Sequence, residues 1–335
     1  MPNNIQPYGD LISDIKQLVN AARKYVATSA NTKLLQTHWT VGKLIIDREE
    51  TDKVNEQSRR SLLIELSKAL TIEIGTGFSR ANLFYMRLFY LANKSGQTVS
   101  DRLNWSHWIE LLKLDDPLER SFYEKQSIAE NWSVRELKRQ KSSLLFHRLA
   151  ISKDADGIMQ LSKQGQVFDD KNDLIKSPYI LEFLGLSEEA RYSESILEQR
   201  IIDNLQRFLL ELGKGFAFVA RQFRITLNNK HYKVDLVFYH RILKCFVLID
   251  LKISDVEHYD IGQMNMYLNY FATEQNVADD NPPIGIILAK EKDEVMVEYA
   301  LGGITNNIFV TKYQLYLPER QLLEDKIKNI LDSTN

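Results

Sequence analysis

The sequence predicts an N-terminal all-helical domain followed by an α+β domain in which helices flank a mixed sheet, as in α/β folds. Apolar residues recur at helical spacing through residues 1–150, and β-like apolar runs begin only at about residue 216. Residues 1–150 carry 22 Lys+Arg against 17 Asp+Glu, and the remainder carries 21 against 28. This difference in charge suits a chain whose N-terminal part binds a polyanion and whose C-terminal part binds a cation. Solvent-exposed charged faces with no common function would produce the same difference.

Bulk features exclude several classes of protein. A chain of 335 residues is long enough for two domains that each bury a core. The single cysteine, Cys245, excludes an intrachain disulfide and suits a reducing compartment. The N-terminus lacks a signal-peptide pattern, and no apolar run approaches the roughly 20 residues that span a bilayer. We therefore expect a cytoplasmic location and no membrane partner.

The first domain, residues 1–151, is expected to contain helices throughout. Apolar periodicity predicts helices over residues 11–22 and 34–45. Capping signals predict the later helices. These run from about Ser58 to Ile74 before Gly75 and Gly77, from Ser79 to about Asn93, onward from Asp116-Pro117, and from Ser133 to about Leu149.

Residues 152–177 are polar and without clear periodicity, and we take them as the linker to a second domain over residues 178–335. That domain is expected to follow the order α-β-β-β-α-β-α-β, with a last helix after Pro318. The predicted elements are a helix over 193–212, strands over 216–227, 232–239 and 245–251, a helix over 260–273, a strand over 284–289, a helix over 293–301 and a strand over 308–313.

Three charged residues interrupt the apolar strands of the second domain. Asp250 and Lys252 end one strand and project from the same face, with Cα atoms about 6.6 Å apart. Asp235 stands inside the preceding strand, and a short turn over residues 240–244 would bring it beside Asp250. Two neighbouring carboxylates repel unless a cation joins them. The pattern therefore suits a Mg²⁺-type ion, which prefers carboxylate oxygens and activates water for phosphodiester hydrolysis.

Asp235, followed fifteen residues later by Asp250-Leu251-Lys252, resembles the signature of the PD-(D/E)XK nuclease superfamily. The resemblance implies a restriction-endonuclease-like αβββαβ core. More narrowly, LLELGKGFAFVARQFRI, VDLVFYHRILKCFVLIDLKI and DIGQMNMYLNYF resemble the bacterial YhcG-type nucleases. In the front half, QTHWTVGKLI, GFSRANLFYMRLFY, LNWSHWIELL and WSVRELKRQ resemble the N-terminal domain of that family. The resemblance thus covers nearly the whole chain.

The resemblance implies roles for individual residues. Asp235, Asp250 and the backbone carbonyl of Leu251 become ligands of Mg²⁺ or Mn²⁺, and Lys252 positions water and stabilises developing charge. The accessory residues are an acid, Glu198, and a polar pair near the scissile phosphate, Gln263 and Tyr267.

Two positions depart from the family's pattern. Val234 stands where the name-giving proline would be, a common variation that matters little. Asp250 replaces a glutamate that is more frequent in the narrower family. Its side chain is one methylene shorter, which would shift the metal but stays within the superfamily pattern.

Ordinary structural roles compete with these assignments. Asp250 and Lys252 alone would also form an ion pair at a strand end. Ser195 and Glu198 have the spacing of a capping box, so Glu198 has an alternative as a helix cap. Gln263 and Tyr267 share a helix face and would also suit plain packing. Arg221 and Gln222 interrupt an apolar strand and are candidates for a phosphate contact.

The helices on either side of residues 75–78 have the arrangement of a helix-turn-helix. We expect Arg80, Arg87 and Lys94 on one stripe of the second helix, where basic residues suit contacts with nucleic-acid phosphates. The buried stripe is expected to contain Ala81, Phe84, Leu88 and Leu91. The alternative is a helical interaction domain, through which the chain would form a homodimer.

We therefore predict a divalent-metal-dependent endonuclease that acts on DNA, with a helical front domain that positions the substrate. A first alternative is a non-catalytic nucleic-acid-binding or adaptor protein on a nuclease fold, against which the intact set of Asp235, Asp250 and Lys252 argues. A second alternative is a nuclease acting on RNA or branched DNA, which no residue discriminates.

Overall fold

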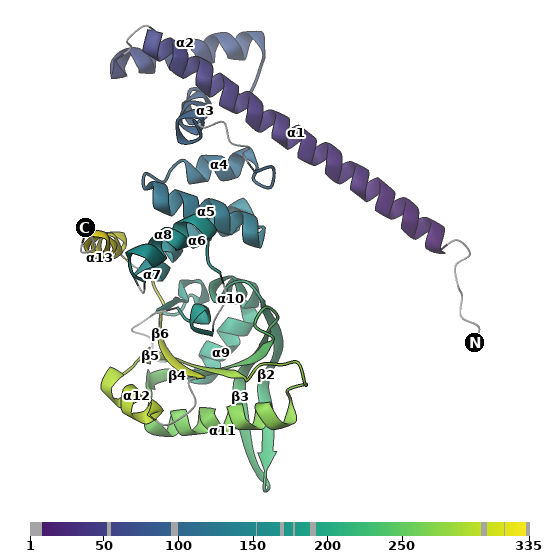
Figure 1. Cartoon of the computed structure of the whole chain (residues 1–335), viewed down its shortest axis with the longest axis vertical. Coiled ribbons are helices and arrows are strands. Elements are labelled where there is room, and N and C mark those ends of the chain that lie inside the picture. The colour runs from purple at the N-terminus through teal and green to yellow at the C-terminus, as the bar shows by residue number, and fades with distance from the viewer. Residues whose placement is uncertain are drawn as a thin grey trace. The chain divides into compact units, whose positions relative to one another are not determined.

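The computed structural model describes residues 9–51, 55–94, 100–151, 153–167, 171–176, 178–187, 192–302, 307–317 and 319–332. The chain divides into two compact units, Met1–Lys138 and Arg139–Asn335. The described part of the first unit is helical, and the second is built on a six-stranded sheet (Figure 1). The predicted fold class is therefore confirmed. Among the described helices, none combines the length and the apolar character needed to cross a membrane.

The described part of the first unit consists of helices, several of which are capped. They are α1 (Gly9–Thr51), α2 (Glu56–Glu73), α3 (Arg80–Ala92), α4 (Trp105–Leu111) and α5 (Pro117–Glu130), and α6 (Val134–Ser142) runs on into the second unit. The predicted caps Ser79 and Asp116 each accept a backbone N–H of the first turn, and Ser133 and Glu136 form the predicted capping box. The two helices predicted before residue 45 are one continuous helix, because no Gly or Pro separates them.

α1 and α3 approach each other closely. Gly42 allows this, because a Cβ at that position would lie 2.0 Å from the carbonyl oxygen of Met86. The buried residues of α3 are Leu83, Met86 and Phe89. The buried stripe predicted for this helix is therefore wrong, and Phe84 of that stripe is 41% exposed. Leu83 and Met86 pack against α1 and α2 instead.

The second unit adds helices, two 3-10 turns and the sheet. The helices are α7 (Leu145–Ala150), α8 (Ala155–Gln164), α9 (Glu194–Asp203), α10 (Leu205–Leu212), α11 (His258–Glu274), α12 (Glu294–Leu301) and α13 (Arg320–Asp332), with turns η1 (Lys171–Leu174) and η2 (Glu182–Leu184). The strands are β1 (Tyr179–Ile180), β2 (Phe216–Leu227), β3 (Lys230–His240), β4 (Cys245–Asp255), β5 (Ile284–Glu291) and β6 (Ile308–Gln314). α8 lies inside the segment expected to be a linker, and the helix expected over 193–212 is divided at Asn204.

The sheet has the strand order β1-β6-β5-β4-β3-β2. β2, β3 and β4 pair antiparallel, whereas β4, β5, β6 and β1 pair parallel, so the sheet is mixed. α9 and α10 pack on one face with Leu236 and Ile249, and α11 and α12 pack on the other with Val237 and Leu248 (Figure 1). Alternate residues of β3 and β4 thus fill opposite cores, as strand geometry requires.

β3 leaves the sheet at the point where the candidate site begins. It pairs with β4 only over Leu236–His240, but with β2 as far as Lys230. The outer parts of β2 and β3 therefore form a two-stranded hairpin that extends from the sheet (Figure 1). The hairpin closes at Asn228 and Asn229, whose φ values of +46° and +61° suit a two-residue type I′ turn.

A buried ionic cluster stabilises the second unit. Glu211, at the end of α10, is 0% exposed, and its carboxylate accepts hydrogen bonds of 2.6 Å from Arg148 and 3.0 Å from the N–H of Ile180. Arg139 lies 3.5 Å from the same carboxylate, and Lys176 donates to the Glu211 backbone carbonyl. Burial alone would raise the pKa of Glu211, but the neighbouring cations lower it. We call these residues the Glu211 cluster.

Candidate active site

Asp235 and Asp250 come from neighbouring antiparallel strands. The last β3–β4 pair is Leu236↔Ile249, so the next position in the register sets Asp235 opposite Asp250. The Oδ2 of Asp235 accepts a 2.8 Å hydrogen bond from the N–H of Leu251, which ties this carboxylate to β4. The two acids therefore meet at the point where β3 turns away from the sheet.

Lys252 is held between two carboxylates. Its Nζ lies 2.9 Å from Oδ2 of Asp250 and 3.2 Å from Oδ1 of Asp260. Burial alone would lower the pKa of Lys252, but the two carboxylates raise it, so the ammonium is charged at neutral pH. Asp260 was missed by the sequence prediction. Its other oxygen accepts the N–H of Glu257 at the start of α11, so its only signal in the sequence was an acid at a helix start.

Glu198 approaches the two acids from α9. It is 4% exposed, and its Oε1 lies 3.0 Å from Nε of Arg221. The helix is capped by Ser193, whose side chain accepts the N–H of Ile196. Because the helix begins there and not at Ser195, Glu198 does not occupy the N3 position. The capping alternative for Glu198 is therefore wrong.

Gln222 was predicted, with Arg221, only as a candidate for a phosphate contact, and its role between two carboxylates was missed. Its Nε2 donates to Oε2 of Glu198 at 2.6 Å and to Oδ1 of Asp235 at 3.1 Å, so one amide joins two carboxylates that would otherwise repel. The residue has a φ of +48°, a left-handed conformation inside a strand that costs on the order of 1 kcal/mol for a side chain of this type. The only sequence signal was a polar Arg-Gln pair in an apolar run.

The three acids Glu198, Asp235 and Asp250, which we call the carboxylate cluster, are not fully compensated. Burial, the charge of Asp250 and then that of Glu198 raise the pKa of Asp235 to about 7. Burial also raises the pKa of Asp250, although Lys252 opposes the shift. Burial and the neighbouring acids thus disfavour the ionised form of Asp235, and a cation bound here would favour it.

The residues fit a hard divalent cation. Asp235 and Asp250 offer carboxylate oxygens side by side, and they are the residues that would hold it. Within the described residues, no group of three or more His, Cys, Asp or Glu is arranged to bind a metal. The remaining ligands would then be water, substrate and backbone carbonyls, which is the usual coordination of Mg²⁺.

Tyr267 and Gln263 lie on α11 beside this site. Tyr267 is 1% exposed, and its hydroxyl donates to the carbonyl oxygen of Lys233 at 2.9 Å. A side chain this buried does not present itself to nucleic acid, so the predicted contact is revised to a structural one that fixes β3 two residues before Asp235. Gln263 is half-buried one turn earlier on the same helix. Arg221, in contrast, keeps 43% of its side chain exposed next to Glu198.

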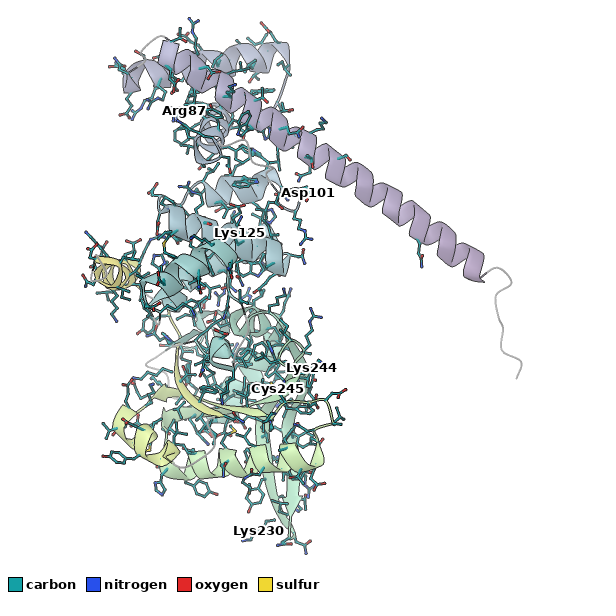
Figure 2. The ribbon with its side chains drawn as sticks, viewed as in Figure 1. Arg87, Asp101, Lys125, Lys230, Lys244 and Cys245 are labelled. Atoms are coloured by element: carbon teal, nitrogen blue, oxygen red, sulfur yellow. The ribbon has the colours of Figure 1, made fainter. Side chains whose placement is uncertain are left out.

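The basic residues predicted on α3 do not share one environment. Arg80 and Lys94 are exposed. Arg87 forms two hydrogen bonds of 2.9 and 2.8 Å with the carboxylate of Glu49 on α1, and only 12% of its side chain is exposed (Figure 2). The predicted phosphate contact of Arg87 is therefore corrected to an ion pair that joins α1 to α3.

Comparison with known proteins gives matches over both halves of the chain. A family model described as the YhcG PDDEXK nuclease domain matches residues 172–328, and one described as the DUF1016 N-terminal domain matches residues 14–148. The chain is 34% identical over 352 residues to a protein of Escherichia coli (strain K12) named "Putative nuclease YhcG", covering 96% of this chain and 93% of that one.

Two solved structures share weaker similarity. A repair endonuclease from Pyrococcus abyssi matches 39% of this chain and 50% of its own, at 20% identity and a TM-score of 0.27. EndoMS in its apo form matches 39% of this chain and 49% of its own, at 16% identity and a TM-score of 0.25.

Proposed function

The chain belongs to the YhcG family of PDDEXK nucleases, and from this premise we propose that it is a divalent-metal-dependent endonuclease that hydrolyses phosphodiester bonds in DNA. The observation that carries the proposal is the juxtaposition of Asp235 and Asp250 next to Lys252. Burial raises the pKa of both carboxylates, and the charge of Asp250 raises that of Asp235 further. The two ionised groups are therefore unfavourable for the protein alone, and a divalent cation would make the arrangement favourable.

Asp235 and Asp250, with the Leu251 carbonyl as a further proposed ligand, would hold Mg²⁺ or Mn²⁺. When bound, this ion polarises the phosphate and lowers the pKa of a water molecule. Gln222 fixes the carboxylate of Asp235 by its 3.1 Å hydrogen bond, and the Leu251 N–H fixes the other oxygen. The chain thus supplies a carboxylate that needs little reorganisation before the cation arrives.

Lys252 is proposed to act on the phosphate. Its ammonium is charged and already oriented by Asp250 and Asp260, so it can donate to a phosphate oxygen as negative charge develops in the transition state. Gln263, half-buried on α11, is proposed as an accessory polar contact near the scissile bond. The exposed guanidinium of Arg221 is proposed to contact a neighbouring phosphate.

The first unit is proposed to recruit or position the nucleic acid. Arg80 and Lys94 are the exposed basic residues of α3 that support this role, whereas Arg87 is engaged with Glu49. Binding that depends mainly on phosphates weakens steeply with salt. If reversing the charges of Arg80 and Lys94 leaves DNA affinity and its salt dependence unchanged, the first unit serves protein interaction instead.

The activity is tested by incubating the purified full chain with supercoiled plasmid, linear duplex, branched DNA, single-stranded DNA and RNA. Each substrate is offered with Mg²⁺, with Mn²⁺ and with EDTA. We expect metal-dependent nicking or linearisation of DNA by the wild type, and none by Asp250→Ala purified in the same way.

Cleavage of RNA alone would change the substrate class and leave the chemistry intact. No cleavage of any substrate, with DNA binding retained, would favour the non-catalytic alternative. Equal cleavage by Asp250→Ala would show that the observed activity comes from a contaminant.

A further inference from the structure

The β2–β3 hairpin beyond the carboxylate cluster is a separate structural feature, which we call the arm and define as residues 223–234. β3 has no β4 partner from Asp235 outward, so the arm is a two-stranded ribbon. Lys230 stands at its tip (Figure 2). At about 3.4 Å per residue, the arm reaches roughly 17 Å from Asp235 to Lys230.

One face of the arm anchors it to the body of the second unit. Phe223, Ile225, Tyr232 and Val234 pack in the core cluster that includes α11, and Ile225 is 0% exposed. The hydroxyl of Tyr267 on α11 donates to the backbone of Lys233. The root of the arm is therefore fixed relative to the site, and Gln222 and Asp235 are the residues that directly precede and follow it.

The opposite face is basic and exposed. Arg224 pairs across the strands with Lys233, and Thr226 pairs with His231, all four being exposed. Like charges placed directly opposite destabilise a β-ribbon, so fold stability does not explain Arg224 facing Lys233. Nη2 of Arg224 lies 2.8 Å from Nε2 of His231, and no carboxylate among the described residues pairs with Arg224.

The charge of this stretch contrasts with that of the chain after it. The arm contains three Lys+Arg and no Asp or Glu, whereas residues 235–335 contain 9 Lys+Arg against 16 Asp+Glu. A positively charged ribbon at the edge of a carboxylate cluster would direct a polyanion to one side of the site.

We propose that the arm binds the phosphate backbone of a nucleic-acid duplex beside the scissile bond. This proposal rests on the proposed function. It names the surface that determines how the duplex is aligned with the active site. The major groove of a duplex admits a two-stranded β-ribbon, and the arm has that form. Arg224, Lys230 and Lys233 would contact phosphates on the flank, while the arm's fixed root keeps the bound duplex aligned with Asp235.

Binding without cleavage tests this directly. A fluorescently labelled 30-base-pair DNA duplex is titrated with the full chain in EDTA over a series of salt concentrations, and anisotropy gives the affinity. The arm variant is Arg224→Gln with Lys230→Gln and Lys233→Gln. The matched control removes three exposed lysines elsewhere in the second unit, through Lys163→Gln, Lys326→Gln and Lys328→Gln.

We expect the arm variant to bind at least about tenfold more weakly, with a salt slope lower by up to roughly 2.7, the value for three lost phosphate contacts. The control variant should change neither quantity by as much. Lys230→Gln alone, at the solvated tip, should lower the slope by about 0.9 without risk to the fold. An arm variant with wild-type affinity and slope overturns the proposal, as does a wild type that binds no duplex.

Cleavage in Mg²⁺, measured on the same samples, separates the two proposals. If the wild type binds through the arm but cleaves nothing, the proposed function is wrong and the proposal that the arm binds nucleic acid stands. If the arm variant cleaves and binds as the wild type does, the proposal for the arm is wrong and the proposed function stands. A variant that keeps its affinity but aggregates would mean that these cations only protect an exposed sheet edge.

Discussion

The second unit contains two clusters of buried charge, and they are balanced differently. In the Glu211 cluster one fully buried acid meets Arg148, Arg139 and Lys176. Arg139 is shared with Glu182, at 3.2 Å, and the cations still outnumber the acids. In the carboxylate cluster Glu198, Asp235 and Asp250 lie together, and Lys252 is shared with a fourth acid, Asp260. The first arrangement satisfies itself within the fold. The second contains more acids than cations, and under the proposed function a divalent cation would complete it.

The two clusters also respond to pH in opposite directions. The pKa of Glu211 is lowered, so its contribution to stability is present above its unfolded pKa and is lost as pH falls. The pKa of Asp235 is raised to about 7, so in the metal-free protein its contribution is present below the unfolded value near 3.8 and is lost as pH rises through 7. Under the proposed function, a bound cation would offset this loss of stability, because it would stabilise the ionised form of Asp235.

The largest expected effect is the loss of activity on changing Asp250. Asp250→Ala removes a metal ligand, so cleavage should fall by on the order of 10³-fold or more and Mn²⁺ binding should be lost. The metal-free protein should not be less stable, since one of three repelling acids is gone. Cleavage time courses, calorimetric Mn²⁺ titration and thermal unfolding measure these quantities.

Asp255→Ala is the matched control for that variant, because Asp255 lies on the same strand but is exposed. It should retain both Mn²⁺ binding and cleavage. If Asp250→Ala binds Mn²⁺ with wild-type affinity, Asp250 is not a metal ligand. The proposed difference between the two clusters would then be wrong.

Glu211→Ala tests the other side of the comparison. The change leaves Arg148, which is 2% exposed, without its buried partner, so the second unit should lose about 3–5 kcal/mol of stability. Urea unfolding measures the loss. Glu291→Ala is the control, because Glu291 pairs with Lys312 at the surface and should contribute less than about 1 kcal/mol. A Glu211→Ala protein as stable as its control would mean that the Glu211 cluster is not structural.

Lys252→Ala distinguishes charge stabilisation from metal binding. The variant keeps Asp235 and Asp250, so it should bind Mn²⁺ at pH 8 within a few-fold of wild type. Cleavage should fall by roughly 10²–10³-fold, as for the loss of one preorganised electrostatic group. Calorimetry and single-turnover cleavage are the measurements. If this variant cleaves at the wild-type rate, Lys252 serves only as a structural partner of Asp250 and Asp260.

The sequence alone was sufficient to predict the strands and the positions of the two acids on them. Alternation along two apolar runs, joined by a short turn, is local information, and it set Asp235 beside Asp250. Helix caps such as Ser79 and Asp116 were equally local and were confirmed. A single apolar stripe was less reliable, since the buried stripe predicted for α3 was wrong.

What the sequence missed depends on contacts between distant residues or on backbone geometry. Arg87 was predicted to face nucleic acid. The ion pair that it forms instead could not be foreseen, because Glu49 lies 38 residues away in the chain. Gln222 acts through a left-handed backbone conformation that periodicity does not reveal. Asp260 contacts Lys252 only because α11 begins beside the end of β4. Polar residues at such points need the fold before their partners can be named.

The smallest expected effect is on the protons released when the metal binds, and it measures the imbalance of the carboxylate cluster directly. With a metal-free pKa of about 7, Asp235 is mostly protonated at pH 6 and mostly ionised at pH 8. Mn²⁺ binding should therefore release nearly one proton at pH 6 and almost none at pH 8. The affinity should rise by up to about tenfold per pH unit below pH 7 and then level off. Calorimetry in buffers of different ionisation enthalpy counts the protons. A pH-independent affinity with no proton release at pH 6 would mean that Asp235 is ionised before the metal arrives, and that its neighbours compensate it as fully as Arg148 compensates Glu211.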